Sequence, residues 1–238
     1  MNTELSTILF LDIETVANVP GYDQLSERLK VQWARKASFF KREQGQTDED
    51  LFNLRAGIYS EFGKIIAIGV GKFYEPSPGT LGIKTRCLSG HDEKTVLSDF
   101  KNLLEKTDQS NLKLCAHNGK EFDFPYLCRR MLVNSILIPD VLNHPGKKPW
   151  EVPYLDTMEM WKFGDHKHYT SLDLLAAIFD IPTSKTDMDG SMVNQVYYKE
   201  QNLNKISAYC IADVVALAQL YLKLKGMQLV DQRFVIEG

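Results

Sequence analysis

The run TILFLDI, residues 7–13, is apolar and rich in residues that favour β structure, and it predicts a central strand. Side chains alternate between the faces of a strand, so Asp12 and Glu14 share one face, while Leu11 and Ile13 point the other way. Two neighbouring carboxylates repel each other, and a divalent cation bound between them removes that repulsion. The pattern indicates a metal site; a solvated acidic pair at a strand end is the alternative.

Further strand-like runs follow the first, and helix and strand then alternate. Strands in succession predict antiparallel neighbours, and alternation with helices predicts a mixed sheet flanked by helices. We expect one α/β domain over residues 1–238, with a helical insertion at about residues 22–58. The other expected strands are 63–74, 83–89 and 112–117, and the expected later helices are 93–106, 125–133, 157–163, 171–179 and 204–225.

The composition restricts the possible functions and locations. A net charge of −3 shows no global basic character, so any contact with nucleic acid must come from a local patch. The cysteines are widely spaced, with no CxxC pair, which favours reduced thiols and a cytoplasmic location. The N-terminus lacks the pattern of a signal peptide, and no run approaches the roughly 20 apolar residues of a membrane span, so we expect no membrane association.

Two further acidic motifs lie at element boundaries. Asp123 stands in NGKEFDFP, residues 118–125, between an expected strand and an expected helix, where α/β proteins often build sites. An N-cap followed by a proline in the first turn is the alternative for this aspartate. Tyr209 and Asp213 lie four apart on the last expected helix and share one face, although a surface pair would have the same spacing.

Together, DIET at residues 12–15, NGKEFDFP and YCIAD at residues 209–213 resemble the three motifs of the four-carboxylate 3′-to-5′ exonuclease superfamily. Ala208 occupies the position at which the histidine subgroup carries its histidine, so the tyrosine subgroup is favoured. The resemblance spans residues 8–225 and is to stand-alone bacterial proteins similar to the exonuclease domain of family B DNA polymerases. It implies a ribonuclease H-like fold: a five-stranded mixed sheet with its first three strands antiparallel and the acids meeting at the sheet edge.

The resemblance also implies a mechanism with two Mg²⁺ or Mn²⁺ ions. By analogy with the family, Asp12 bridges both ions, Glu14 and Asp213 hold the ion that carries the nucleophile, and Asp123 binds the second ion. Tyr209 orients the attacking water, since an ordinary phenol, with a pKa of about 10, is a poor base at neutral pH. The expected product is a nucleoside 5′-monophosphate.

The resemblance implies single-stranded DNA as the substrate and free-standing repair or end trimming as the role, with any polymerase or repair factor a separate partner. An exoribonuclease similar to ribonuclease D is the alternative with the same chemistry, because the sequence does not show how the 2′-hydroxyl is treated. A binding domain without catalysis is a further alternative, but such a domain should have lost at least one acid.

Several residues are candidates for contact with nucleic acid. Thr15, Asn118 and Phe122 adjoin the acidic motifs and are candidates for the terminal nucleotide. The stretch 28–42 is basic without a single acid, and its aromatic residues could stack on bases; a solvated basic helix with its aromatics packed inward is the alternative. The further candidates are Trp33, Arg35 and Lys36 in that stretch, and Lys147 and Lys148 in a later loop.

Other constellations do not predict a site. Asp187 and Asp189 imitate part of a calcium loop, but the remaining ligand positions are wrong. His166 and His168 lack a third strong ligand at a suitable spacing. Asp156 precedes Thr-Met-Glu, which is typical of a helix cap.

Overall fold

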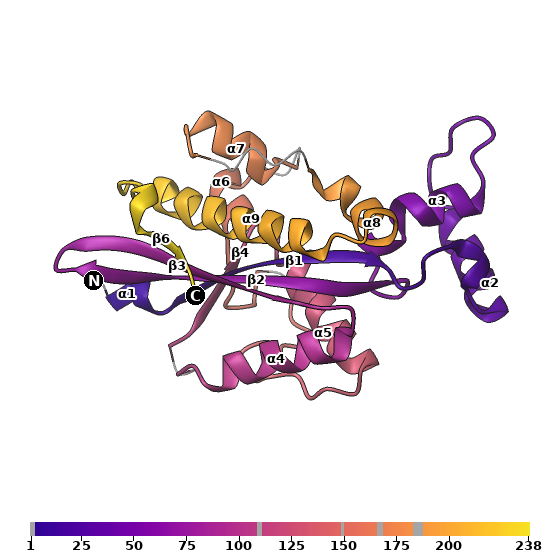
Figure 1. The fold of residues 1–238 in the computed structure, drawn as a ribbon, viewed down its shortest axis with the longest axis horizontal. Helices are drawn as coiled ribbons and strands as arrows, with labels where there is room; N and C mark the ends of the chain where they lie inside the picture. The colour runs from indigo at the N-terminus through magenta and orange to yellow at the C-terminus, as the bar shows by residue number, and fades with distance from the viewer. Residues whose placement is uncertain (1–2, 109–110, 149, 166–168, 183–187) are drawn as a thin grey trace.

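The computed structural model describes residues 3–108, 111–148, 150–165, 169–182 and 188–238, and it shows helices on both faces of one mixed sheet (Figure 1). His166, His168 and Asp187 lie outside the described residues. The strands are β1 (Ile8–Ala17), β2 (Gly63–Ser77), β3 (Thr80–Ser89), β4 (Lys113–Ala116), β5 (Leu155–Asp156) and β6 (Val235–Glu237). The helices are α1 (Thr3–Ser6), α2 (Glu27–Ala37), α3 (Asp48–Arg55), α4 (Glu93–Glu105), α5 (Asp123–Val133), α6 (Thr157–Lys162), α7 (Leu172–Ile178), α8 (Val193–Gln195) and α9 (Leu203–Leu224).

The sheet has the strand order β5-β4-β1-β2-β3-β6. The first three strands are antiparallel neighbours, as predicted, while β4, β5 and β6 each pair in parallel. The described sheet has six strands rather than the expected five. Two short strands lie outside the four expected ranges: β5, with two residues, and β6, a three-residue edge strand that pairs Val235 with Ile83. Neither has a run long enough to stand out in the sequence.

The central strand β1 divides its side chains between two cores, as its alternation predicts. Leu9, Leu11 and Ile13 lie in the core under α4 and α5, and Ile8 and Phe10 lie in the core under α9. Pairing with β4 covers only Ile8–Phe10, so the second half of β1 pairs with β2 alone. Asp12 and Glu14 therefore lie at the end of the sheet where β1 extends beyond β4, rather than on an edge strand.

Helix α9 is long and apolar enough to span a membrane by length and composition, which the sequence analysis did not expect. It packs instead along β1, β2 and β3, with its residues Val214, Leu217 and Tyr221 in the core above the sheet (Figure 1). More than half of its most apolar window is buried, as in the core helix of a globular domain.

Residues 22–58, called the insertion below, form a small helical unit at one end of the sheet (Figure 1). Trp33 is 0% exposed and lies at its centre, among Leu51, Phe52 and Phe62. The Trp33 Nε1 donates a hydrogen bond to the Asp48 carbonyl oxygen at 2.8 Å. The ring has no free face for a base, so the prediction that Trp33 contacts nucleic acid is wrong, and the alternative with aromatics packed inward holds for this residue.

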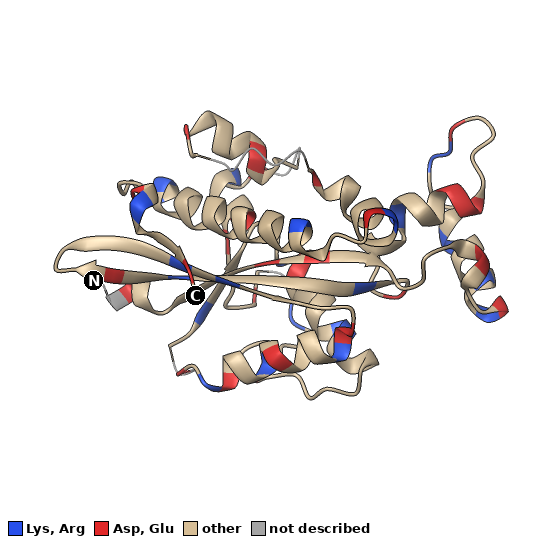
Figure 2. Ribbon diagram, viewed as in Figure 1, with Lys and Arg blue, Asp and Glu red and all other residues tan. Residues whose placement is uncertain are grey.

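Acids lie close to the basic stretch 28–42 in the folded insertion. Arg42 pairs with Asp48, and Lys30 pairs with Glu27. Figure 2 shows Lys and Arg beside Asp and Glu on both α2 and α3. The insertion is therefore a surface of mixed charge rather than a basic patch.

Candidate active site

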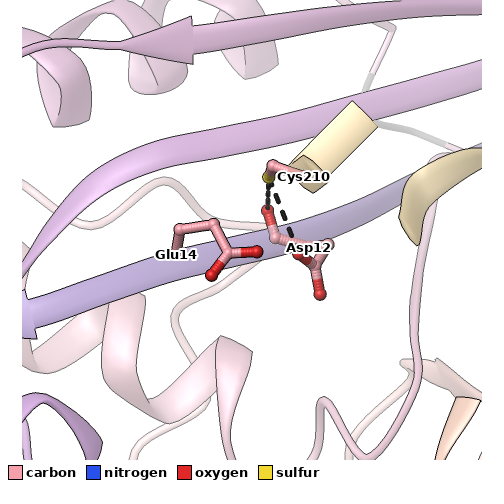
Figure 3. A group of neighbouring side chains, drawn as sticks. All are labelled: Asp12, Glu14 and Cys210. Atoms are coloured by element: carbon pink, nitrogen blue, oxygen red, sulfur yellow. Dashed lines mark hydrogen bonds between the residues drawn. The ribbon is translucent and has the colours of Figure 1, made fainter. Parts of the chain in front are cut away.

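Strand β1 provides the first two acids of the candidate site. Asp12 is partly buried and Glu14 is buried, and a β-bulge in the pairing with β2 falls directly after Glu14. Bulges change the direction of side chains and recur next to active sites. One ligand atom from each of Asp12, Glu14 and Cys210 lies within 4.8 Å of the others. Figure 3 shows these three side chains as neighbours.

Helix α9 provides the next two residues, because two glycines let it lie close to the sheet. A Cβ at Gly69 would stand 2.8 Å from the Cys210 sulfur, and one at Gly71 would stand 2.6 Å from Val214. The Gly69 N–H donates to Cys210 Sγ at 3.1 Å, and this sulfur lies 3.5 Å from the Asp12 carbonyl oxygen (Figure 3). The close packing places the turn that carries Tyr209 and Asp213 over Asp12.

Helix α5 provides the fourth acid. Asp123 is the first residue of α5 rather than its N-cap, and its buried Oδ1 accepts a hydrogen bond from the Ile13 N–H at 3.2 Å. The carboxylate thus reaches the central strand, and the capping alternative does not hold for this residue.

The loop before α5 is held by Asp156. Its carboxylate caps α6, as predicted, by accepting from the Met158 N–H at 2.9 Å. The same carboxylate accepts from the N–H groups of Asn118 at 2.9 Å and Lys120 at 3.1 Å. Asn118 has a positive φ of 59°, which asparagine tolerates better than most residues. Asp156 therefore fixes the loop that leads into Asp123.

All four acids and Tyr209 line one cavity of about 630 Å³. Thr15, Asn118 and Phe122, the candidates for the terminal nucleotide, line the same cavity. A cavity of this size, with converging polar groups and apolar walls, is typical of a small-molecule or terminal-nucleotide site.

The other predicted contacts lie elsewhere. Lys147 lines a separate cavity beside α5, and the Lys148 ammonium lies 5.1 Å from the Trp150 ring centroid. Arg35 is exposed on α2, and the Lys36 ammonium lies 3.9 Å from the Tyr59 ring centroid. The fold does not bring these four cations to the carboxylates, so their contact with nucleic acid stays a prediction.

Burial dominates the electrostatics of the site. It raises the pKa of each of the four carboxyl groups, because desolvation penalises the charged form: to about 7 for Asp123 and about 6 for Asp213. The charges of neighbouring acids raise the pKa of Asp12 and Glu14 further. A hydrogen bond from the Tyr209 hydroxyl lowers the pKa of Asp213 in part, and burial raises the pKa of Tyr209 itself. The phenol therefore stays protonated at neutral pH.

The donor set fits a divalent cation. Among the described residues, no lysine, arginine or histidine forms an ion pair with any of the four acids. Carboxylate oxygens are the ligands that Mg²⁺ and Mn²⁺ prefer, and a cation held among them would supply the missing counter-charge. Cys210 is fully buried between α9 and β2, which leaves the oxygens to face the cavity.

Several lining residues were not predicted from the sequence. His117 stands at the end of β4, where its Nε2 lies 2.8 Å from the Thr170 carbonyl oxygen. Its place after a strand was a usable signal, since such positions often carry function. Leu54, Ile58 and Tyr169 also line the cavity, and no local pattern marks them because they come from segments far away in the sequence.

Comparisons with known proteins agree with this geometry. Residues 58–233 match the family described as "Predicted 3'-5' exonuclease related to the exonuclease domain of PolB". The match includes Asp123, Tyr209 and Asp213, while Asp12 and Glu14 precede it. No curated protein matches the chain.

Among solved structures, the chain is similar to the family B DNA polymerase from the hyperthermophilic archaeon Pyrobaculum calidifontis, with a TM-score of 0.58 and 16% sequence identity. The likeness covers 92% of this chain but only 24% of the polymerase chain. At this identity it shows the fold alone, and it confirms the ribonuclease H-like class.

Proposed function

The chain belongs to the family of predicted 3′-5′ exonucleases related to the exonuclease domain of PolB, and from this premise we propose a substrate and a mechanism. The substrate is single-stranded DNA, which the enzyme shortens from its 3′ end. The products are nucleoside 5′-monophosphates, and the reaction uses two Mg²⁺ or Mn²⁺ ions.

One observation carries the proposal. Three elements that are far apart in the sequence, β1, α5 and α9, place four carboxylates on one cavity with no cationic side chain paired to them among the described residues. An arrangement of like charges in a desolvated place is costly unless a bound cation neutralises it. The complete set of acids also argues against a binding domain that has lost catalysis.

Each residue has a role that its position supports. Asp12, Glu14, Asp123 and Asp213 would hold the ions: Asp12 would contribute to both, Glu14 and Asp213 to the ion that activates water, and Asp123 to the second. When bound, the ions would supply a water of lowered pKa and neutralise charge on the leaving 3′-oxygen. Tyr209, protonated and hydrogen-bonded to Asp213, would orient the attacking water rather than remove its proton.

The context of the activity is also proposed. The chain spans 24% of the polymerase chain it resembles. We propose free-standing repair or end trimming as its role, with any polymerase or repair factor acting as a partner. All four cysteines are free thiols, which supports the proposal of a reducing, cytoplasmic location.

A gel time course tests the proposal. DNA and RNA single strands of matched sequence, labelled at the 5′ end, are incubated with Mg²⁺ or Mn²⁺ and with wild type, Asp12→Asn or Asp213→Asn. We expect a ladder that shortens from the 3′ end of DNA, absent with chelator and in both variants. A circular single strand, which has no end, is the control and should stay intact.

Each alternative has its own outcome. A ladder on RNA but not DNA would transfer the proposal to an exoribonuclease. Cleavage of the circular strand would overturn the assignment as an exonuclease. Tight binding of the strand with no product under any condition would favour a binding role.

A further inference from the structure

The insertion contributes one wall of the carboxylate cavity. Asn53, Leu54, Gly57 and Ile58, from the end of α3 and the 3₁₀ turn Ala56–Ile58, line the cavity together with the four acids. These residues stand at or before the start of the family match at residue 58. The wall thus belongs to the insertion, and its residues lie outside the basic stretch 28–42.

The wall presents apolar side chains to solvent. Leu54 is 68% exposed and Ile58 is 53% exposed, although Leu51 and Phe52 on the same helix are buried in the insertion's core. Exposed aliphatic side chains at the rim of a cavity that contains four carboxylates have no role in binding a metal. Such surfaces mark sites for an apolar partner.

Hydrogen bonds fix the wall against β1. The Gly57 carbonyl oxygen accepts from the hydroxyls of Thr15 and Tyr126, each at 2.8 Å. A Cβ at Gly57 would stand 3.2 Å from the backbone of Thr15 and Val16, so the turn lies directly on the strand. The Thr15 hydroxyl thus positions the wall.

A second tie holds the end of α3. The Asn194 Oδ1 accepts from the Ala17 N–H at 3.0 Å, and its Nδ2 donates to the Asn53 carbonyl oxygen at 3.4 Å. Asn194 itself lines the cavity. Strand β1 is thus joined to the insertion at Gly57 and, through Asn194, at Asn53. The backbone that carries Leu54 and Ile58 is therefore held to the strand that carries Asp12 and Glu14.

We propose that Leu54 and Ile58 form a base-binding wall, which packs against the base of the 3′-terminal nucleotide while its phosphate lies at the carboxylates. This inference rests on the proposed function. A nucleotide joins a charged phosphate to a flat base with an apolar face, and the cavity joins four acids, ready for metal, to a rigid apolar side. Because every base has such a face, the wall grips ends of any sequence.

Kinetics with altered ends test the wall. The double variant Leu54→Ala, Ile58→Ala is compared with Leu137→Ala, which removes an 82% exposed aliphatic side chain that lies outside the insertion and does not line the cavity. We expect KM for single-stranded DNA to rise about tenfold in the double variant with kcat nearly unchanged, because the contact is present before and during the reaction. Leu137→Ala should match wild type.

An abasic 3′-terminal nucleotide separates base contact from a structural role. The KM of wild type should be about tenfold higher for this end than for the normal end. The KM of the double variant should be the same for both ends, since the contact is already absent. Independent losses that multiply, or an unchanged KM in the double variant, would overturn the wall while leaving the exonuclease intact.

Binding measurements keep the inference separate from the proposed function. Fluorescence anisotropy of the same labelled strands is measured in the Asp12→Asn background, where no cleavage is expected. The double variant should bind the normal end about tenfold more weakly and the abasic end unchanged. If wild type yields no ladder, the proposed function has failed, and equal binding by the double variant and Leu137→Ala would then refute the wall as well.

Discussion

Buried carboxylates occur on both sides of the sheet, but their surroundings differ. On the α4 and α5 side, Glu93 accepts from Arg130 Nε at 2.8 Å and Nη2 at 2.6 Å, from the Ile65 N–H at 2.7 Å and from Asn134 Nδ2 at 2.8 Å. On the α9 side, Asp12 and Glu14 share their surroundings with other acids.

The difference separates structural charge from functional charge. The charge of Glu93 is neutralised within the fold by Arg130. The ion pair and the hydrogen bond from Ile65 join α4, α5 and β2 without a bound ligand. The four acids at the cavity leave their charge for a ligand to neutralise. A protein tolerates such local instability where function requires it.

The largest expected effect comes from removing one of the functional charges. Asp12→Asn should lower exonuclease activity at least about a thousandfold, the scale of losing one group that stabilises charge in the transition state. The metal-free variant should be as stable as wild type or more so, because a desolvated charge has gone. Activity and thermal unfolding in chelator measure the two effects, with Glu121→Gln, an exposed acid near Asp123, as the control.

The reverse result is expected at Glu93. Glu93→Ala leaves the Arg130 guanidinium buried without its partner and should lower the free energy of unfolding by about 3–5 kcal/mol. Activity per folded molecule should stay near that of wild type, because Glu93 does not line the cavity. Urea unfolding and active-site titration measure these quantities. A variant that is stable but inactive would remove the distinction between the two regions.

A rise in pH and the binding of Mg²⁺ should change the stability of the folded protein in opposite directions. The pKa of Asp123 is raised to about 7 and that of Asp213 to about 6 in the folded chain. In the unfolded chain both carboxyl groups have the ordinary aspartate pKa of about 4. The folded metal-free chain therefore binds more protons than the unfolded chain between about pH 4 and 7, and these groups lower stability as pH rises through that window.

Mg²⁺ binds the ionised acids and should reverse that loss. At a hundred times its Kd it should add about 2.7 kcal/mol. The rise in Tm on adding Mg²⁺ should be larger at about pH 7.5 than at about pH 5.5, and small in Asp213→Asn. A rise that does not depend on pH would mean that the cation binds elsewhere.

The smallest expected effect concerns a neutral group at the cavity. Tyr209→Phe removes the hydroxyl that is hydrogen-bonded to Asp213 and should lower kcat by about tenfold. This is less than the roughly 10²–10⁴-fold that a group transferring the proton itself contributes, because the proposed role is orientation alone. KM should change little, since the phenol orients water rather than the strand. Steady-state kinetics decide this, with Tyr74→Phe on β2 as the control. A complete loss of activity would assign Tyr209 a larger part than orientation.

Much of the sheet and the acids could be predicted from local patterns. Alternation in β1 separated Asp12 and Glu14 from Leu11 and Ile13, and the spacing of Tyr209 and Asp213 placed both on one side of α9. Each of these inferences uses a period that the backbone imposes on neighbouring residues. The short strands β5 and β6 carry no such period and were missed.

The insertion shows where local patterns were insufficient. The stretch 28–42 looks like a basic surface with aromatic side chains. In the structure, Trp33 is buried in the core of the insertion, and Arg42 pairs with Asp48. The residues that reach the cavity, Leu54 and Ile58, have no sequence signal of their own. Their position depends on Gly57 packing against β1, a contact between residues 42 apart in the chain.

The sequence by itself determined the candidates for the chemistry: the four acids, the tyrosine and the elements that carry them. The tertiary structure alone decided which surfaces meet there, including the close approach of α9 over Gly69 and the position of the insertion at the cavity rim. The physical reason is that periodicity reveals which face of an element is apolar but not which distant element covers it. That choice depends on how all of the elements pack together.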